Sequence, residues 1–326
     1  MPSRSAYSGA EQDKSVTIAL RSKFIGSLVG TAVGDGLGAS LEGAHLVEPA
    51  QVLALGESRP MLIYTDDTHM AIGVAESLLE KKGLDGEHMV RTFIRNFDVE
   101  PWRGYGPGPP RVFARIKAGE PWDKAAGRTY GGGSFGNGAA MRVAPVGLLY
   151  HDDRERLRQA AYGSSQITHA HELGKEGAAL QAYAVALACR AQPPALDGQR
   201  FLDELDEFMG HRVYKEKLRK IRALLGEPDR LKVVMTLGNG IEAFNSVPAA
   251  IYSFLRYPSS FEEAVVYAIS LGGDTDTIGA MCGAISGAYL GVKGIPERWR
   301  SKVENRTYLE ELAERLWRLK RAAGKT

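Results

Sequence analysis

The chain has 326 residues, of which 44% are hydrophobic and 25% are charged, the composition of a globular protein with one large core or two small ones. A formal net charge of +2 excludes the strong field that typifies proteins bound directly to nucleic acids or to anionic membranes. Only two cysteines are present, so we expect a reducing compartment and no disulfide framework.

The opening stretch, MPSRSAYSGAEQDKS, lacks the apolar core that a secretory signal requires. We therefore predict a disordered tail over residues 1–16 and a single domain over residues 17–326. The protein is expected in the cytoplasm, or also in the nucleus if the source is eukaryotic, and not outside the cell.

The first strong element is a helix over residues 16–42, in which apolar residues recur at every fourth position. Glycines recur at the same spacing in two separate stripes, Gly26, Gly30, Gly34 and Gly38 near one end of the chain and Gly279, Gly283, Gly287 and Gly291 near the other. Each glycine costs a helix about 1 kcal/mol relative to alanine. Close backbone contact between the two helices is the expected compensation.

Small residues at this spacing also pack transmembrane helices, so a membrane protein is the alternative. The apolar run over residues 278–292 is, however, shorter than the roughly 20 residues that a bilayer needs. Asp35 also interrupts the first stripe. We therefore expect no membrane partner.

Apolar residues at helical spacing predict further helices over 67–82, 87–98, 155–163, 172–191, 200–224, 229–255, 261–271 and 304–323. Strand signals are scarce, which indicates an all-α fold. The segment over residues 99–145 is rich in glycine and proline, and it is expected to be a long irregular stretch with a functional role.

Two clusters of threonine and aspartate, YTDDTH (64–69) and GGDTDT (272–277), each precede an apolar helix. Taken singly, each cluster is most simply a helix N-cap, because threonine and aspartate side chains accept hydrogen bonds from free N–H groups there. Taken together, the clusters have a second interpretation. If the glycine stripes bring their helices into contact, a set of five carboxylates can converge, namely Glu42, Asp66, Asp67, Asp274 and Asp276.

Five carboxylates cannot share a pocket unpaired, because burial and mutual repulsion would protonate them or unfold the chain. Bound cations remove this conflict. Ligands that are all oxygen favour Mg²⁺, or Mn²⁺ in its place, and this many acids suits two ions better than one.

Seven stretches carry a resemblance to a known family. They are GDGLGASLE (34–42), YTDDTHMA (64–71), RGYGPG (103–108), GSFGNGAAMRVAP (133–145), THAHELG (168–174), LGNGIEAFNSVPAAIYSFLR (237–256) and SLGGDTDTIGAMCGAISGAY (270–289). In this order, over about residues 20–290, they resemble the ADP-ribosylglycohydrolase family, and within it the serine-type animal ADP-ribosylhydrolase 3 group. The resemblance implies a compact orthogonal helix bundle with a dinuclear magnesium site in a cleft.

The resemblance also implies roles for individual residues. The implied metal ligands are Thr65, Asp66, Asp67, Asp274, Asp276 and Thr277, together with Glu42, which matches a mobile acidic flap residue of the family. The implied substrate contacts are Gly104, Gly106, Gly133, Ser134, Phe135, Gly136, Asn137, His169 and Ile241. Backbone N–H groups of the glycine-rich loop GGGSFGNG can hold a diphosphate, and Phe135 offers a face to adenine or ribose. A tyrosine commonly stands at this position in the serine-type group.

The implied reaction is hydrolysis of the bond between ADP-ribose and serine, with poly(ADP-ribose) and O-acetyl-ADP-ribose as further substrates. Such a cleavage passes through a transition state with oxocarbenium character. Asp274 or Asp276 is expected to orient the attacking water, and Glu42 to supply a proton to the leaving oxygen.

Three alternatives stay open. An arginine-type ADP-ribosylhydrolase is the nearest one within the family. A two-metal phosphohydrolase acting on a nucleotide diphosphate would use the same acids and loop, but would release AMP. A non-enzymatic structural protein, like some lens relatives, would have no need of the four aspartates. An ADP-ribosylated protein or polymer is the expected partner, and we expect a monomer.

Overall fold

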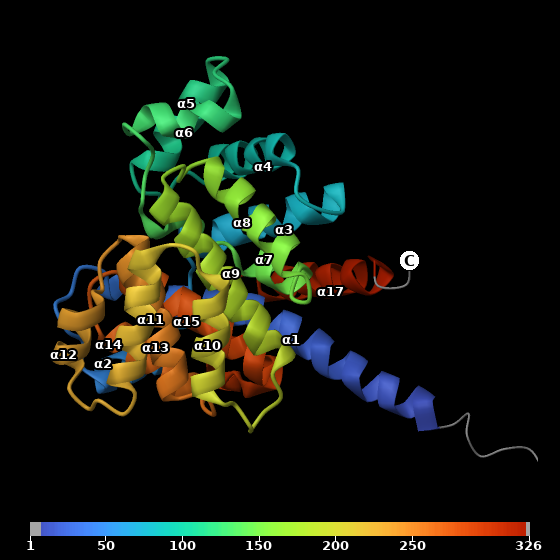
Figure 1. The fold of residues 1–326 in the computed structure, drawn as a ribbon, viewed down its shortest axis with the longest axis vertical. Coiled ribbons are helices and arrows are strands. Elements are labelled where there is room, and N and C mark those ends of the chain that lie inside the picture. Colours follow the sequence, from blue (N-terminus) through green and yellow to red (C-terminus); the bar gives the residue numbers. More distant parts are fainter. Residues whose placement is uncertain (1–7, 324–326) are drawn as a thin grey trace, which may run out of the picture.

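The computed structural model describes residues 8–323, and the side chains of residues 20–323. The described chain contains seventeen α-helices and three short 3₁₀-helices (Figure 1). The α-helices are α1 (Ser8–Gly38), α2 (Pro49–Ser58), α3 (Asp66–Lys81), α4 (Gly86–Val99), α5 (Gly108–Lys117), α6 (Trp122–Thr129), α7 (Ala144–Leu149), α8 (Arg154–Gln166), α9 (Glu172–Arg190), α10 (Gly198–Phe208), α11 (Arg212–Leu224), α12 (Arg230–Leu237), α13 (Ala243–Arg256), α14 (Phe261–Ser270), α15 (Thr275–Leu290), α16 (Glu297–Arg300) and α17 (Arg306–Ala323).

The 3₁₀-helices are η1 (Ala39–Leu41), η2 (Asn137–Ala139) and η3 (Val292–Gly294). Within residues 8–323 the chain forms no β-strand, and its only bridges are two isolated pairs, Leu62 with Val303 and Gly136 with Glu242. The expected all-α class is therefore confirmed. The expected tail over residues 1–16 stays a prediction: α1 begins at Ser8, and residues 1–7 lie outside the described part of the chain.

The two glycine stripes face each other where α1 and α15 pack antiparallel, as expected. A β-carbon on Gly34 would lie 2.0 Å from the carbonyl oxygen of Gly279, and one on Gly30 would lie 2.3 Å from that of Gly283. Only glycine permits backbones to approach this closely. The contact also places the start of α15 against the end of α1, where Thr275 Oγ1 donates a hydrogen bond to the Gly38 carbonyl at 2.9 Å.

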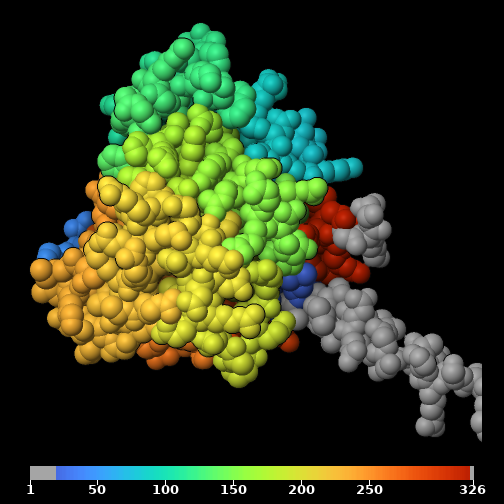
Figure 2. Space-filling view, in the orientation of Figure 1, coloured from blue at the N-terminus to red at the C-terminus, as the bar shows by residue number. Residues whose placement is uncertain are grey.

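The segment Leu20–Leu41 of the described chain is apolar and long enough to cross a membrane, with a mean hydropathy of 1.3. In the structure, 89% of its most apolar window is buried, and it packs on α15. In the space-filling view, the N-terminal residues drawn in blue appear only in small areas at the margins of this face (Figure 2), because later helices cover residues 20–38 there.

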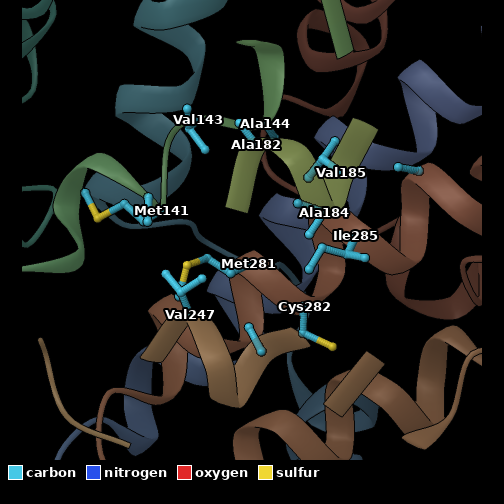
Figure 3. Close-up of a cluster of buried hydrophobic side chains, with 14 of the residues drawn as sticks. Met141, Val143, Ala144, Ala182, Ala184, Val185, Val247, Met281, Cys282 and Ile285 are labelled. Carbon is cyan, nitrogen blue, oxygen red and sulfur yellow. The ribbon is translucent and has the colours of Figure 1, made fainter. Parts of the chain in front are cut away.

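Helices α9, α13 and α14 pack on α15, and α7 packs on α9, to form the centre of the core (Figure 3). Small side chains such as Ala182 and Ala184 on α9 let the helices approach, while Met281 and Ile285 of α15 fill the space between them. Dense packing of this kind holds α15 rigidly in place.

Two helices that the sequence predicts as continuous are each broken in two. The segment 200–224 forms α10 and α11 with a break at residues 209–211, and the segment 229–255 forms α12 and α13 with a break at residues 238–242. In the second case Gly238 adopts φ +81°, the left-handed region in which glycine ends helices. The break matters because its backbone contacts the site described below.

The segment over residues 99–145 is more ordered than the sequence predicts. It contains α5, α6 and the start of α7, together with η2. Each of the first two helices buries only a few apolar side chains, among them Val112 and Phe113 of α5 and Ala125 of α6. Their sequences, GPPRVFARIK and WDKAAGRT, contain too few large apolar residues at helical spacing for periodicity to reveal them.

We predict that Gly30→Ala lowers the free energy of unfolding by about 1–3 kcal/mol, because its β-carbon would overlap the Gly283 carbonyl and push the backbones apart. Urea denaturation measures the change. The control is Gly127→Ala in α6, where no atom lies within 4 Å of the new β-carbon. That variant should gain about 1 kcal/mol. Equal stability of the Gly30 variant and the wild type would contradict the close contact.

Candidate functional site

Three acids meet where η1 and α15 adjoin. One carboxylate oxygen each from Glu42, Asp274 and Asp276 lies within 4.8 Å of the others. Asp274 is the N-cap residue of α15, and Asp276 lies in its first turn. Both are buried, while Glu42 follows η1 and is exposed. The predicted convergence of acids from distant segments is therefore confirmed for these three.

The other acidic cluster reaches the same place from the start of α3. Thr65 Oγ1 donates a hydrogen bond to Asp67 Oδ2 at 3.2 Å, and Thr277 Oγ1 of α15 donates to the same oxygen at 3.4 Å. The second carboxylate oxygen of Asp67, Oδ1, is buried and has no hydrogen-bond partner among the described residues. A buried oxygen left without a donor is a position that a cation would satisfy.

Asp66 begins α3 and is buried beside these groups. Gly104, which φ +85° marks as a position suited to glycine, lies across from it: a β-carbon there would be 4.0 Å from Asp66 Oδ1. All seven predicted ligand residues thus belong to the start of α3, the start of α15 or the turn after η1.

Burial and mutual repulsion raise the pKa values of these acids. Burial, with Asp276 as the nearest source of repulsion, raises the pKa of Asp67 well above its usual range. The pKa of Asp276 is raised to about 9 by burial and by Asp274, and that of Asp66 to about 8 by burial and by Asp35. Burial and Asp274 also raise the pKa of Glu42. The cluster cannot carry its full charge without bound cations, so its residues fit a metal site.

Asp35 is a positioning residue whose role the sequence did not reveal. It is fully buried on α1 and accepts hydrogen bonds from Thr65 N at 2.9 Å, Thr68 N at 3.1 Å and Thr68 Oγ1 at 2.6 Å. Burial raises the pKa of this carboxyl to about 6, and the same hydrogen bonds oppose that rise. In the sequence, the signal for this role was a single carboxylate between two glycines of an apolar helix. In the structure it ties the start of α3 to α1.

The glycine-rich loop is fixed against the break between α12 and α13. Asn137 N donates to the Ile241 carbonyl at 2.9 Å, and Ala243 N donates to the Phe135 carbonyl at 3.0 Å. Asn137 Nδ2 then donates to Asp274 Oδ2 at 2.5 Å. This amide connects the predicted substrate loop directly to the acids.

The same break also holds the start of α15. Asp274 N donates to the Asn239 carbonyl at 2.9 Å. Gly273 has φ +70°, and a β-carbon on it would lie 2.1 Å from that carbonyl oxygen. A glycine is therefore required directly before Asp274.

His169 lies behind the loop and is buried. Burial, with a further contribution from Arg142, lowers its pKa to about 3, so the ring is neutral. Arg142 Nη1 donates to Thr168 Oγ1 at 2.9 Å, and this hydroxyl is hydrogen-bonded to His169 Nδ1 at 2.8 Å. The other ring nitrogen, Nε2, lies beside the glycine loop, where a β-carbon on Gly138 would be 2.8 Å from it. The neutral ring of His169 thus presents a polar atom to the loop.

Arg142 is a second positioning residue that the sequence did not reveal, although it lies within a motif quoted above. It is fully buried, and its guanidinium also donates to the Ser164 carbonyl at 2.7 Å and lies over the ring of Phe93. No single-residue signal separates a buried arginine of this kind from a surface one.

The remaining predicted substrate contacts lie at or near the loop. Phe135 is 44% exposed and its ring meets that of His171 edge to face, while Ile241 is 64% exposed. Ser134 Oγ accepts a hydrogen bond from Gly136 N at 3.1 Å. Gly133, with φ +91°, packs against the backbone at His171. Gly106 faces open space, and no contact connects it with the acids.

The raised pKa values make the stability of the cation-free protein depend on pH. Asp66 and Asp276 have pKa values of about 8 and about 9 when folded and an ordinary value of 3.8 when unfolded. Such acids hold protons more tightly in the folded state, so their contribution to stability falls as pH rises between the two values. After chelation, we expect the thermal midpoint to fall as pH rises from about 4 to about 9.

Adding Mg²⁺ or Mn²⁺ should remove most of this dependence, because cations bind the ionised carboxylates and displace their protons. Calorimetry at pH 7 in buffers of different ionisation enthalpy measures the protons released. Asp276→Asn is the matched control and should show a shallower dependence on pH. A cation-free protein whose stability rises over the same pH range would contradict the account.

Comparisons with known proteins identify the family of the chain. Residues 17–326 match the sequence profile described as ADP-ribosylglycohydrolase. ADP-ribosylhydrolase ARH3 of Mus musculus and that of Homo sapiens are each 38% identical to this chain over 340 aligned residues. Each alignment covers 91% of this chain, together with 92% of the mouse protein or 93% of the human protein. An uncharacterized protein of Archaeoglobus fulgidus is 35% identical, covering 92% of this chain and 97% of its own.

A solved chain described as an ADP-ribosylglycohydrolase-related protein complex superimposes with a TM-score of 0.72 and 26% sequence identity, covering 92% of this chain and 99% of that one. The sequence match and the structural match both cover nearly the whole of this chain. The chain therefore belongs to the ADP-ribosylglycohydrolase family and is an ADP-ribosylhydrolase.

Proposed function

We propose that this enzyme is a Mg²⁺-dependent hydrolase that releases ADP-ribose from serine residues of modified proteins, with poly(ADP-ribose) and O-acetyl-ADP-ribose as further substrates. The observation that carries the metal dependence is the meeting of the acids of α3 and α15 around the unsatisfied Asp67 Oδ1. The serine preference rests on the GNG and SVPAAIY stretches, by resemblance. A monomer in the cytoplasm or nucleus is part of the same proposal.

The donor set fits two hard cations, because carboxylate and hydroxyl oxygens are the ligands that Mg²⁺ prefers. The proposed ligands are Glu42, Thr65, Asp66, Asp67, Asp274, Asp276 and Thr277. When bound, the ions would supply Lewis-acid activation of water and a fixed position for the ribose hydroxyls. Mn²⁺ meets the same requirements.

The chain's own groups would bind and orient the substrate. Phe135 exposes a ring for the adenine or its ribose, and the loop supplies backbone N–H groups for the diphosphate. Nε2 of the neutral His169 ring adds a polar contact beside the loop. Asn137 keeps Asp274 aligned through its 2.5 Å hydrogen bond.

Glu42 is the proposed source of the proton for the leaving serine oxygen. In the cation-free protein, burial and the neighbouring Asp274 raise the pKa of its carboxyl, and in the loaded enzyme Glu42 can donate a proton only when it does not ligate the cations. It lies on an exposed turn and within reach of the acids, which lets it approach the scissile bond.

We predict that Asp66→Asn and Asp274→Asn each lower turnover at least 100-fold and weaken Mg²⁺ binding, while circular dichroism shows unchanged helix content. The assay is mass-resolved hydrolysis of serine-modified and arginine-modified peptides with and without Mg²⁺. Release of ADP-ribose from the serine peptide alone is expected. Release from the arginine peptide alone would indicate the arginine type, and release of AMP would indicate a phosphohydrolase. Full activity in excess chelator would contradict the metal dependence.

We expect Glu42→Ala to lower kcat for the serine peptide about 10²-fold or more, the range of general acid catalysis, with little change in the Kd for ADP-ribose. Single-turnover kinetics and calorimetry measure the two quantities. Asp98→Ala serves as the surface control, because it removes an exposed acid of α4 that does not belong to the acid cluster. An effect of Glu42→Ala on affinity alone would place this residue in binding and not in proton transfer.

A further inference from the structure

A groove of about 800 Å³ opens beside the proposed reaction centre. At one end its lining includes Thr65 and Gly104, which adjoin Asp66. Ala39 and Ser40 of η1, which lead to Glu42, also line it. The groove therefore adjoins the proposed reaction centre.

Large apolar side chains are unusually exposed along this groove. Trp102 is 71% exposed, Ile63 is 59% exposed and Met61 is 49% exposed, and all three line it. Exposed apolar side chains that gather at one place mark a binding surface, and tryptophan and methionine are enriched at interfaces. Neither the metal ligands nor the glycine loop uses these three residues.

The groove and the glycine loop adjoin the acids through different residues. The loop reaches the acids through Asn137 and Asp274, whereas the groove reaches them through Thr65 and Gly104. A substrate with its ribose at the acids and its ADP on the loop would direct the group bonded to the ribose away from the loop. In the function proposed above, that group is the modified residue of a polypeptide.

The floor of the groove is held in place before any partner binds. Arg103 donates to Glu304 at 2.6 Å and to Glu100 at 2.8 Å, and its guanidinium stacks 4.3 Å from the ring centre of Tyr64. This arginine is neutralised by its partners. A preformed floor lowers the entropy that binding costs.

Arg59 is the remaining cation of the groove. It donates to the Gly36 carbonyl at 2.9 Å and to Ser40 Oγ, and it forms no ion pair among the described residues. An apolar groove with one unneutralised arginine suits an extended peptide with apolar side chains and a single acid. It does not suit an ADP-ribose polymer, whose repeated phosphates would need several cations.

We propose that the groove formed by Met61, Ile63 and Trp102, with Arg59 at its edge, binds the polypeptide that flanks the ADP-ribosylated residue. This inference rests on the proposed function, and it adds a protein-recognition surface to the hydrolytic site. Removing the apolar side chains should affect substrates only through the flanking polypeptide.

The test compares two substrates that share one scissile bond, ADP-ribosyl-serine as the free amino acid and the same group within a peptide. For the double variant Met61→Ala/Trp102→Ala, we expect KM for the peptide to rise about 10-fold. KM for the free amino acid and the Kd for ADP-ribose should stay within 2-fold of the wild type. Met235→Ala is the matched control, because Met235 is 81% exposed and does not line the groove.

Three outcomes would overturn the inference: an equal loss with both substrates, no loss with either, or a slowing of polymer hydrolysis as large as that with the peptide. A change of oligomeric state in the double variant, measured by analytical ultracentrifugation, would also overturn it, because the groove would then join two copies of the chain. Fluorescence anisotropy with the labelled peptide distinguishes failure of this inference from failure of the proposed function. Wild-type protein that hydrolyses neither substrate contradicts the proposed function. If wild-type protein nevertheless binds the peptide and the double variant does not, the groove proposal is still supported.

Discussion

The close backbone contact between α1 and α15 is the constraint on which the site depends. A β-carbon on Gly34 or Gly30 would overlap a carbonyl oxygen of α15, so the two helices can lie this close only because both are striped with glycine. The contact places the first turn of α15 against the end of α1. Asp274 and Asp276 are thereby brought to Glu42, and Asp35 of α1 is left free to hold the start of α3.

This arrangement stabilises a cluster that is unfavourable by itself. Burial and repulsion raise the pKa values of Asp66, Asp67 and Asp276, which means that folding disfavours their charged forms. The N-termini of α3 and α15 offset part of this cost through their partial positive charge. The densely packed core around α15 offsets the rest, which is how a protein can keep a functional site that its own stability opposes.

The features that the sequence revealed are local patterns. Glycine spacing predicted the α1–α15 contact, and the two threonine–aspartate clusters predicted the acids, because each pattern is complete within one short stretch. Two structural predictions, a continuous helix through residues 238–242 and an irregular stretch over residues 99–145, were wrong. Gly238 ends α12 in a left-handed conformation that suits the site, and α5 and α6 contain too few large apolar residues at helical spacing for periodicity to reveal them.

Residues whose roles depend on distant partners could not be assigned from the sequence. Asp35 and Arg142 act through the side chains and backbone that they hold, and the hydrogen-bond partners named above lie 22 to 33 positions away along the chain. The groove next to Thr65 is assembled from η1, the segment before α3 and the segment around Trp102, so no single motif describes it. Such features require the folded chain, whereas the acids and glycines did not.

The most direct test of the central claim is anomalous diffraction from crystals grown with Mn²⁺. The account predicts two peaks, each contacting carboxylate oxygens from both the start of α3 and the start of α15, with Asp67 Oδ1 among the ligands. Peaks that contact only one of the two helices, or an empty space between Asp66 and Asp274, would contradict it.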